Sequence, residues 1–583
     1  MIDRRGQISE AMDNTGKVIR KNILSTYPGA VLYGLFFNVS LMLDSIIAGQ
    51  SLGAQGVAAV ALGVPGHGIL SAIVYSLIHG SGLRMIWAKG RADDHAFRRA
   101  LNGGATVIAL CGIVFTLLLF IFAEDIVILC GGDMVDAATL NDAVIYLRYC
   151  SPITTLTALG ITLQEIMNVF GFQNSRAVLS VINVVVNLAV SILCVSYLPA
   201  GMKLAGLGIG TAVAGLAEFM AGVIIFRIKK VHLGYRPMIP RLRELVEMLK
   251  CGFPASTDYL VENIAVGFQN NVILSGFPGD PLMLPVADVV CNISYFAAGA
   301  IKGAALATEP LFGVYYEERD VNSIKQVWKQ GLILGLVMSV IWSVLFLVFQ
   351  PALSSLFGMR LTEDISTGVL ICMIFTPIGH VVYMFTLYYE ATKRFALSTT
   401  FAVLPDSVLF IVLMVLLIPV LGKFGVWLPI TGNQVIGMVL LIPIVCFILG
   451  RLRKGADKLL LLPKEFYTGV TIDEFEILGD KEDLSVKMGK FKGILQETLS
   501  DTDKADAVIT GVEEIVSYMS RTSKHIHIKL RDEGDKKEIF VRSIGQSCYL
   551  PEAVTENDNV WRDAVTVTYS YVYKMNIVRL RIC

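Results

Sequence analysis

A series of long apolar segments constrains the fold of this chain more than any other feature. Twelve segments of about 20 residues or more follow one another, and a helix of that length crosses the roughly 30 Å hydrocarbon core of a bilayer. Because 54% of the residues are hydrophobic and only 17% are charged, we expect an all-α polytopic membrane protein. The predicted spans lie near residues 25–48, 57–83, 101–123, 143–170, 176–198, 204–227, 249–275, 284–314, 328–350, 365–391, 396–421 and 425–450.

Basic residues set the expected orientation, because Lys and Arg of short loops stay on the cytoplasmic side of a membrane. They gather before the first span and after the second, sixth and twelfth, at residues 4–21, 84–99, 227–250 and 451–454. Both termini are therefore predicted to be cytoplasmic, and we expect a multi-pass protein of the plasma membrane, here a bacterial inner membrane. The ten cysteines form no CxxC pair and no Cys/His cluster, so no metal site is predicted.

The membrane part also repeats itself. LSTYPGAV around Pro28 matches LKCGFPAS around Pro254, the segment from Ile78 matches that from Ile301, and SPITTLTALGITLQE matches TPIGHVVYMFTLYYE. The three offsets agree at about 225 residues, so spans 1–6 repeat as spans 7–12. An even number of helices in each repeat makes the two six-helix lobes parallel, related by an axis along the membrane normal, with a substrate path between them. The expected divisions are an N-terminal segment 1–22, lobes 23–228 and 249–455, a linker 229–248 and a cytoplasmic domain 461–583.

Three stretches, together with the six-plus-six repeat, carry a family resemblance. They are LDSIIAGQSLGAQGVAAVALGVP after the first span, ATEPLFGVYY after the eighth and FGVWLPITGNQVIG at the start of the twelfth. Nearly all of residues 20–455 resembles multidrug and toxin extrusion (MATE) transporters, within the superfamily that also holds polysaccharide and lipid-intermediate flippases. The resemblance implies the MATE fold. It also implies a secondary antiporter rather than an enzyme, which exports cationic or amphipathic xenobiotics in exchange for protons or sodium and uses no other cofactor.

The first span carries an acid, Asp44, and an acid inside a membrane is a functional hypothesis by default. The resemblance matches Asp44, Asn183 and Asn187 to a constellation proposed to bind the coupling ion, with an amide in place of the family's second carboxylate. Gly215 aligns where the family often has a threonine. A lone buried carboxylate suits proton exchange, whereas a dehydrated sodium ion prefers more oxygen ligands and more negative charge, so proton coupling is favoured. The alternative is that Asp44 only hydrogen-bonds the amides between helices.

The second half carries its own line of charge. Glu262, in the seventh span, matches a glutamate that one subgroup of the family uses for cation coupling. Polar residues also recur at steps of four and seven along the eighth span, and Glu218 of the sixth joins this group. We expect a cavity lining of net negative charge that attracts organic cations; the alternative is an ion-pair network with no transport role. The predicted cavity residues are Asp258, Gln269, Asp288, Asn292, Tyr295, Lys302, Glu309 and Asp406. Glu165 and Glu390, near the cytoplasmic ends, are predicted to be solvated.

After residue 461 the long apolar runs end and a separate domain is predicted. The expected order is a strand FEIL, a helix from Lys481, a helix ADAVITGVEEIVSYMS, a hairpin of HIHIKLRD and KEIFVRSIG, a helix from Val560 and a strand IVRLRI. This order favours an α/β sandwich. The stretch resembles the ATPase domain of histidine kinases, and especially of anti-sigma-factor kinases, through EEIV and VRSIG.

Departures from that resemblance predict a degenerate nucleotide site. Ser517 or Tyr518 stands where the family has its metal-binding asparagine, and Ser543 stands for the aspartate that contacts adenine. We therefore expect poor or no ATP binding, no kinase activity, and a role in regulation or in binding a cytoplasmic regulatory protein, with a folded cap as the alternative. The residues of the degenerate site are Glu513, Glu514, Ser543, Gly545 and Asn576.

Two further readings stay open beside the antiporter. One is a flippase for a lipid-linked or polar conjugate, which a broad basic cavity would favour, and the other is a membrane sensor that signals through the C-terminal domain. In each case the expected partners are a small molecule and the lipid bilayer, without nucleic acid, and the chain is expected to be a monomer.

Overall fold

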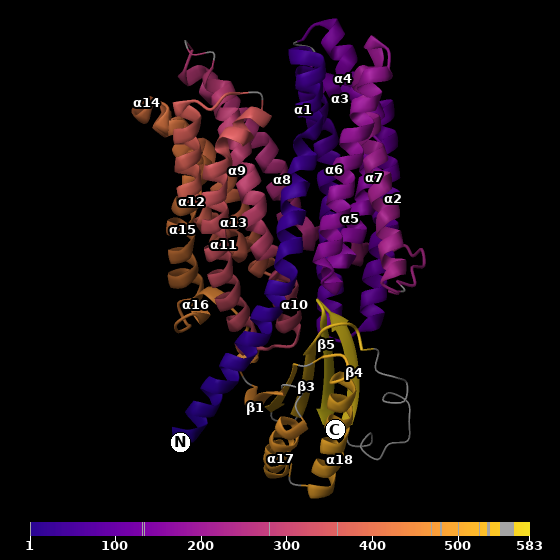
Figure 1. Cartoon of the computed structure of the whole chain (residues 1–583), viewed down its shortest axis with the longest axis vertical. Coiled ribbons are helices and arrows are strands. Elements are labelled where there is room, and N and C mark those ends of the chain that lie inside the picture. Colours follow the sequence, from indigo (N-terminus) through magenta and orange to yellow (C-terminus); the bar gives the residue numbers. More distant parts are fainter. Residues whose placement is uncertain are drawn as a thin grey trace.

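The computed structural model of the chain is two helical bundles side by side, with a small sheet domain against one end (Figure 1). We call that end of the molecule the sheet end. The structure describes residues 2–582, apart from residues 131, 133, 134, 232, 279, 281, 358, 468, 478–480, 500, 524, 533–536 and 549–564.

The first bundle, called the first lobe, is built from α1 to α7. Their bounds are α1 Ile2–Gly90, α2 Asp94–Ile121, α3 Ala123–Leu129, α4 Ala137–Cys150, α5 Ile153–Phe170, α6 Gln173–Tyr197 and α7 Lys203–Ile228. α1 contains two spans, residues 16–52 with a bend of 44°, and Leu62–Gly90. Asn22 and Gly90 both lie at the sheet end, because Asn22 contacts the sheet domain and Gly90 packs on Val314, so the chain turns back between the two spans.

The second bundle, called the second lobe, follows with α8 Leu242–Gly276, α9 Met283–Leu306, α10 Glu309–Glu317, α11 Val321–Leu356, α12 Glu363–Ala391, α13 Phe395–Val403, α14 Phe410–Leu421, α15 Phe424–Pro443 and α16 Asp457–Leu460. Between α13 and α14 runs a π-helical turn, Leu404–Leu409, that contains Pro405. Proline removes a backbone donor, and π turns are frequent at functional sites. This turn carries Asp406.

Among the described residues, 10 helices are long and apolar enough to cross a membrane, or up to 11 if the bent pair in α1 is one span. The predicted seventh span corresponds to α8, which is 35 residues long and is not among the helices counted. Two predicted spans are broken in the structure. The fourth is divided at Pro152, between α4 and α5, and the eighth ends at Leu306, because Pro310 begins the separate helix α10.

Small residues bring the two lobes into close contact. A Cβ atom at Gly80 would lie 1.9 Å from the carbonyl oxygen of Met248 in α8, and one at Gly34 would lie 2.3 Å from that of Gly299 in α9. Only glycine permits such a close approach of two helix backbones. Nearer the sheet end, the indole of Trp87 donates to the carbonyl oxygen of Ala391 at 2.8 Å. These contacts join the lobes along the half that faces the sheet domain.

The sheet domain has five antiparallel strands in the order β1-β2-β3-β5-β4. Its elements are β1 Val470–Ile477, α17 Lys481–Thr498, α18 Thr502–Met519, β2 Ile526–Asp532, β3 Lys537–Ile544, β4 Val565–Val572 and β5 Met575–Ile582. One face of the sheet packs on α17 and α18 through a buried apolar cluster that includes Leu530, Val541 and Val512. The two layers confirm a small domain of sheet and helices.

The helix predicted from Val560 is wrong over residues 565–572, which form β4, while residues 560–564 lie outside the described residues. The sequence VTVTYSYV explains the strand, because it alternates β-branched and aromatic residues, which favour pleated structure. Tyr573 and Lys574, with φ of 50° and 57°, form the two-residue turn to β5. We call this pair the hairpin tip.

Candidate functional site

Asp44 lies in the first lobe at the centre of a cluster of neutral donors. The Tyr146 hydroxyl donates to one carboxylate oxygen at 3.0 Å, and the Thr211 hydroxyl lies 2.9 and 3.0 Å from the two oxygens. The Asn187 amide nitrogen is 3.4 Å away. Asp44 is 9% exposed and Asn187 is fully buried, so this carboxylate is held by hydrogen bonds rather than by a cation.

A second carboxylate, Glu218, lies on α7 about two helical turns after Thr211. Asn183 donates to it at 2.7 Å, Gln164 donates to its other oxygen, and the side chain is 2% exposed. Ser40, one turn before Asp44, donates to Asn183 at 2.9 Å and so links the two acids. The first lobe therefore holds a pair of buried acids with neutral partners, where the sequence predicted a lone carboxylate and assigned Glu218 to the second-lobe group.

The sequence comparison aligned Gly215 of α7 with the family's threonine, but the threonine that contacts Asp44 is Thr211, one turn earlier. Gly215 packs on α5, where a Cβ would lie 2.5 Å from the Thr157 hydroxyl, and Thr211 supplies the hydroxyl to Asp44. The spacing Thr211, Gly215, Glu218 marks one face of α7 and was a signal available in the sequence. Tyr146 belongs to α4, whose contact with α1 no local pattern indicates.

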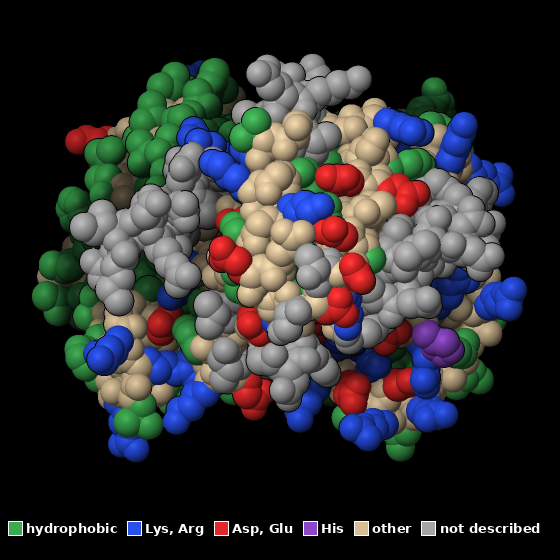
Figure 2. Space-filling model, turned by 90° about the horizontal axis from the view of Figure 1, so that it is seen from below, with side chains coloured by type: hydrophobic (Ala, Val, Ile, Leu, Met, Phe, Trp, Pro, Cys, Tyr) green, Lys and Arg blue, Asp and Glu red, His purple; other side chains and the backbone are tan. Residues whose placement is uncertain are grey.

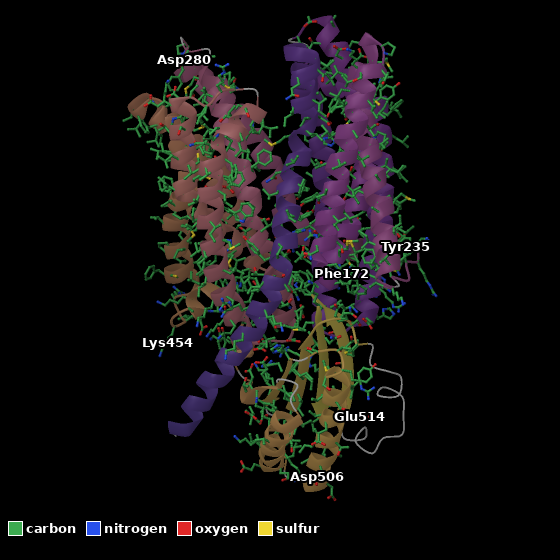
Figure 3. All side chains as sticks on the ribbon, in the orientation of Figure 1. Phe172, Tyr235, Asp280, Lys454, Asp506 and Glu514 are labelled. Atoms are coloured by element: carbon green, nitrogen blue, oxygen red, sulfur yellow. The ribbon has the colours of Figure 1, made fainter. Side chains whose placement is uncertain are left out.

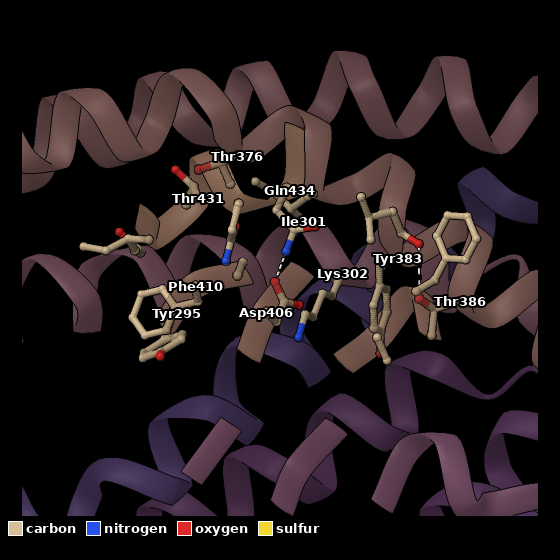
Figure 4. A pocket seen from close by; sticks show the side chains of 18 residues that line it. Tyr295, Ile301, Lys302, Thr376, Tyr383, Thr386, Asp406, Phe410, Thr431 and Gln434 are labelled. Carbon is tan, nitrogen blue, oxygen red and sulfur yellow. Dashed lines mark hydrogen bonds between the residues drawn. The ribbon is translucent and has the colours of Figure 1, made fainter. Parts of the chain in front are cut away.

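The second lobe contains a cavity of about 100 Å³ (Figure 4). Three predicted residues line it, Tyr295, Lys302 and Asp406. Gln434 donates to Asp406, and the Lys302 ammonium lies 5.0 Å from the centre of the Tyr383 ring. Figure 4 shows Asp406 and Lys302 on the same side of this cavity. The described lining of this cavity thus carries one acid and one base, Asp406 and Lys302.

The remaining predicted cavity residues do not line this cavity. Gln269 is buried and donates to the Cys291 sulfur at 3.3 Å, and Asn292 donates to Asp288 at 3.1 Å. Glu309 lies beyond the end of α9 and faces the other lobe. The side chains of Asp258 and Glu262 lie outside the described residues.

Glu165 and Glu390, predicted to be solvated, are 5% and 1% exposed. They lie at the lobe interface with Glu309, where all three face the imidazole of His79. The prediction that Glu165 and Glu390 are solvated is therefore wrong, because both side chains are buried although they are near helix ends.

The sheet domain contacts the second lobe through a buried ion-pair network. Glu318 and Asp320, between α10 and α11, are called the acidic corner. Arg542 of β3 donates to Glu318 at 2.6 Å and to Asp320 at 3.1 Å, and Lys529 of β2 pairs with Asp320 at 2.8 Å. All four side chains are 5% exposed or less. One face of the sheet is therefore apolar against its own helices, while the other is charged against the lobe.

The electrostatics of this network depend on burial and pairing together. Although burial opposes it, attraction to Lys529 and Arg542 holds the pKa of Asp320 below its ordinary value. Burial raises the pKa of Glu318, and Arg542 offsets only part of that effect. Breaking such a buried pair by removing one partner costs about 3–5 kcal/mol.

The hairpin tip contacts the first lobe. α5 ends at Phe170, followed by Gly171 at φ 73°, and the last carbonyl groups of a helix lack partners within it. The backbone N–H groups of Tyr573 and Lys574 donate to the carbonyl oxygens of Val169 and Phe170 at 2.8 and 3.1 Å. The tip thus caps α5. Figure 3 shows the neighbouring Phe172 where this lobe meets the sheet.

The predicted nucleotide-site residues separate into two groups. Ser543 and Asn576 are buried and paired across β3 and β5, and Asn576 also accepts from the Cys548 N–H at 3.0 Å and the Tyr569 hydroxyl at 2.7 Å. Gly545, at φ 158°, follows β3. Glu513 and Glu514 are exposed on α18, and Figure 3 shows Glu514 far from the lobes. The oxygen of Asn576 is therefore occupied by protein donors.

Comparison with known families gives a match between residues 30–193 of this chain and the MatE family model. No curated protein matches the chain in sequence.

Solved structures extend the likeness to both lobes. A "Crystal structure of MATE in complex with MaD3S" is 17% identical, with a TM-score of 0.65 over 74% of this chain and 96% of that chain. An "Outward-facing conformation of a multidrug resistance MATE family transporter of the MOP superfamily" gives the same identity, TM-score and coverage. A "Crystal structure of MATE in the straight conformation" is 16% identical, with a TM-score of 0.63 over 74% and 96%. The membrane part therefore has the MATE fold.

Proposed function

We propose that the protein is a proton-coupled antiporter that exports amphipathic small molecules, cations among them, by alternating access between its two lobes. The observation that carries the proposal is the pair of buried acids, Asp44 and Glu218, held by neutral donors inside one lobe of a MATE fold. A buried acid without a cation is costly when charged, so it favours binding a proton in one state of a cycle and releasing it in another.

The donor set favours a proton over sodium. The Asn187 amide nitrogen faces Asp44, while its oxygen accepts from Ser191 at 2.8 Å. An amide nitrogen cannot ligate a cation, and the amide oxygen is directed elsewhere. This arrangement hydrogen-bonds a carboxyl group and offers few free oxygens to a sodium ion.

The second-lobe cavity indicates the substrate class. Aromatic rings of Tyr295, Tyr383, Phe401 and Phe410 line it beside the Lys302 and Asp406 pair. Such a lining suits molecules with an apolar body and a small polar or charged group. A flippase for a polar conjugate would need a broader basic surface than one lysine supplies.

We propose that the sheet end is cytoplasmic. Figure 2 shows this end from below, with Lys and Arg side chains around much of its rim. Exposed Lys454 lies near this end (Figure 3), and exposed Arg98 is near the start of α2, just after Gly90; these positions agree with the positive-inside rule.

The sheet domain is proposed to regulate transport by holding both lobes at this end. Arg542 and Lys529 bind the acidic corner of the second lobe, and the hairpin tip caps α5 of the first lobe. Alternating access requires the lobes to separate here, so a domain bound to both opposes that movement. A membrane sensor would use the same contacts to pass a signal to the sheet domain. A transport assay distinguishes the two hypotheses, because only a regulated transporter moves substrate.

Export is tested in proteoliposomes loaded with purified full-length protein. A fluorescent organic cation such as ethidium is followed while a pH gradient is imposed across the membrane. Gradient-driven flux is expected for the native protein and is expected to vanish in Asp44→Asn, whereas Glu124→Gln, at an exposed acid of α3, keeps the native rate. Native protein that gives no gradient-driven flux of any amphipathic probe would overturn the antiporter.

A further inference from the structure

A second group of buried titratable side chains lies where the two lobes meet. His79, in the second span of α1, is 8% exposed. Its Nδ1 atom lies 3.9 Å from Glu165, and its Nε2 atom lies 3.7 Å from Glu309 and 3.7 Å from Glu390. Glu309 and Glu390 are therefore close to each other, because a carboxylate oxygen of each lies 3.7 Å from the same nitrogen. We call His79 and these three acids the His79 cluster.

The cluster bridges the lobes. Glu165 belongs to α5 of the first lobe, while Glu309 and Glu390 belong to α10 and α12 of the second. The internal repeat matches Glu165 with Glu390 and His79 with Lys302, so equivalent acids of the two halves meet on one imidazole. One ring nitrogen faces each lobe, which makes His79 the link between them.

Other charged and titratable groups of the described residues surround this site. Arg176 of α6 donates to Glu165 at 2.8 Å and lies 4.0 Å from the centre of the Tyr33 ring. The Tyr75 ring stacks on His79 at 6.1 Å. Three acids therefore face one guanidinium and one imidazole, and the neutral titratable groups around them are Tyr33, Tyr75, Tyr383, Tyr573 and Cys251.

The geometry favours a proton at this site. A neutral imidazole has a hydrogen on only one nitrogen, and the other nitrogen carries a lone pair. Because carboxylates lie 3.7–3.9 Å from both nitrogens, a neutral ring with three ionised acids would direct a lone pair toward a carboxylate. A second hydrogen on the ring, or a proton on one acid, removes this repulsion, so the closed interface favours one additional proton.

We propose that the His79 cluster is a proton-binding site that holds the sheet end of the lobe interface closed, separate from the acids of the first lobe. The proton balances one of the three acid charges and lets His79 attract both lobes. When the proton leaves to solution, His79 no longer attracts Glu309 and Glu390 of the second lobe, those two acids repel each other, and the lobes separate at that end. The inference rests on alternating access in the proposed function.

The position of the cluster determines the side of the membrane to which the proton is released. If the sheet end is cytoplasmic, loss of the proton to the cytoplasm opens the side from which substrate is loaded. This order suits an exporter driven by protons that enter from the opposite side. One linked proton changes the ratio of open to closed molecules by up to tenfold per pH unit.

The test measures the distance between the lobes at the sheet end as a function of pH. Spin labels are introduced as unnatural amino acids at exposed Arg98 of α2 and exposed Lys454 after α15, in full-length protein in nanodiscs. Distances are recorded by electron-electron double resonance between about pH 5.5 and pH 8.5, with no substrate and no gradient. Absence of transport would therefore not affect this readout.

In native protein the long-distance population is expected to grow as pH rises. His79→Gln should remove that dependence, and Glu390→Gln should move the midpoint to lower pH, because one acid fewer attracts the proton. His95→Gln, at an exposed histidine of α2, should leave the curve unchanged. A native distance distribution that does not change with pH would overturn the proposal. So would a curve that keeps its midpoint and slope in folded His79→Gln and Glu390→Gln.

Discussion

The contact between the sheet domain and the acidic corner can be broken at one residue. Arg542 is buried and donates to both Glu318 and Asp320, whereas Asp320 also keeps Lys529 as a partner. Arg542→Ala therefore leaves Glu318 buried without its ion-pair partner. Removing one partner of a buried pair costs about 3–5 kcal/mol. Since 1.4 kcal/mol is about a factor of ten, docking should weaken by roughly a hundredfold to several thousandfold.

Hydrogen–deuterium exchange of the full-length protein measures this effect. Faster exchange is expected in segments 314–322 and 570–576, which carry the acidic corner and the hairpin tip, while β2 and α18 stay protected because the apolar face is untouched. Arg521→Ala, at an exposed arginine after α18, is the matched control and should exchange like native protein. Unchanged exchange at both segments in Arg542→Ala would refute the docking energetics. Loss of protection throughout β2 would instead mean that the domain had unfolded.

Two further outcomes follow from the packing and the charges. Gly80→Ala places a Cβ 1.9 Å from the Met248 carbonyl oxygen and should destabilise the closed arrangement of the lobes by about 1–3 kcal/mol. The distance between labels at Arg98 and Lys454 should then increase. Gly68→Ala, whose Cβ would meet nothing within 4 Å, should not change that distance. Burial raises the pKa of Glu474, but Lys529 and His527 outweigh burial and lower that pKa from 4.5 to about 2. The stabilisation that ionised Glu474 gives the sheet is therefore complete above pH 4.5 and is lost as the pH falls toward 2. Exchange of β1 and β2 amides should rise over that window in native protein, and Glu474→Gln should flatten the rise; a variant as pH-dependent as native protein would contradict the assignment.

Periodicity and length predicted the membrane part well because a bilayer imposes its thickness on every span. The divided spans show where that reasoning stops, since Pro152 and Pro310 stand at the start of new helices inside apolar stretches that length alone joins. The helix predicted over residues 565–572 is wrong because VTVTYSYV alternates β-branched and aromatic residues, which favour the strand β4.

The candidate site was predictable only where its residues share a helix. The stripe of Asn183 and Asn187 follows from spacing on α6, and the first-lobe acid from its placement in an apolar run. Tyr146 and Glu390 reach their sites through contacts between distant helices, which no single stretch encodes. Glu165 and Glu390 were expected in solvent because they are near helix ends, yet the sheet domain and the opposite lobe cover that end.

Simultaneous recording of proton and cation fluxes in the same proteoliposomes tests the central claim most directly. A pH dye inside the vesicles reports proton movement while the fluorescent organic cation reports export. The account predicts that each flux drives the other in native protein and that Asp44→Asn brings both to the level of empty vesicles. Cation flux that proceeds in Asp44→Asn at the native rate, with protons still exchanged, would contradict it.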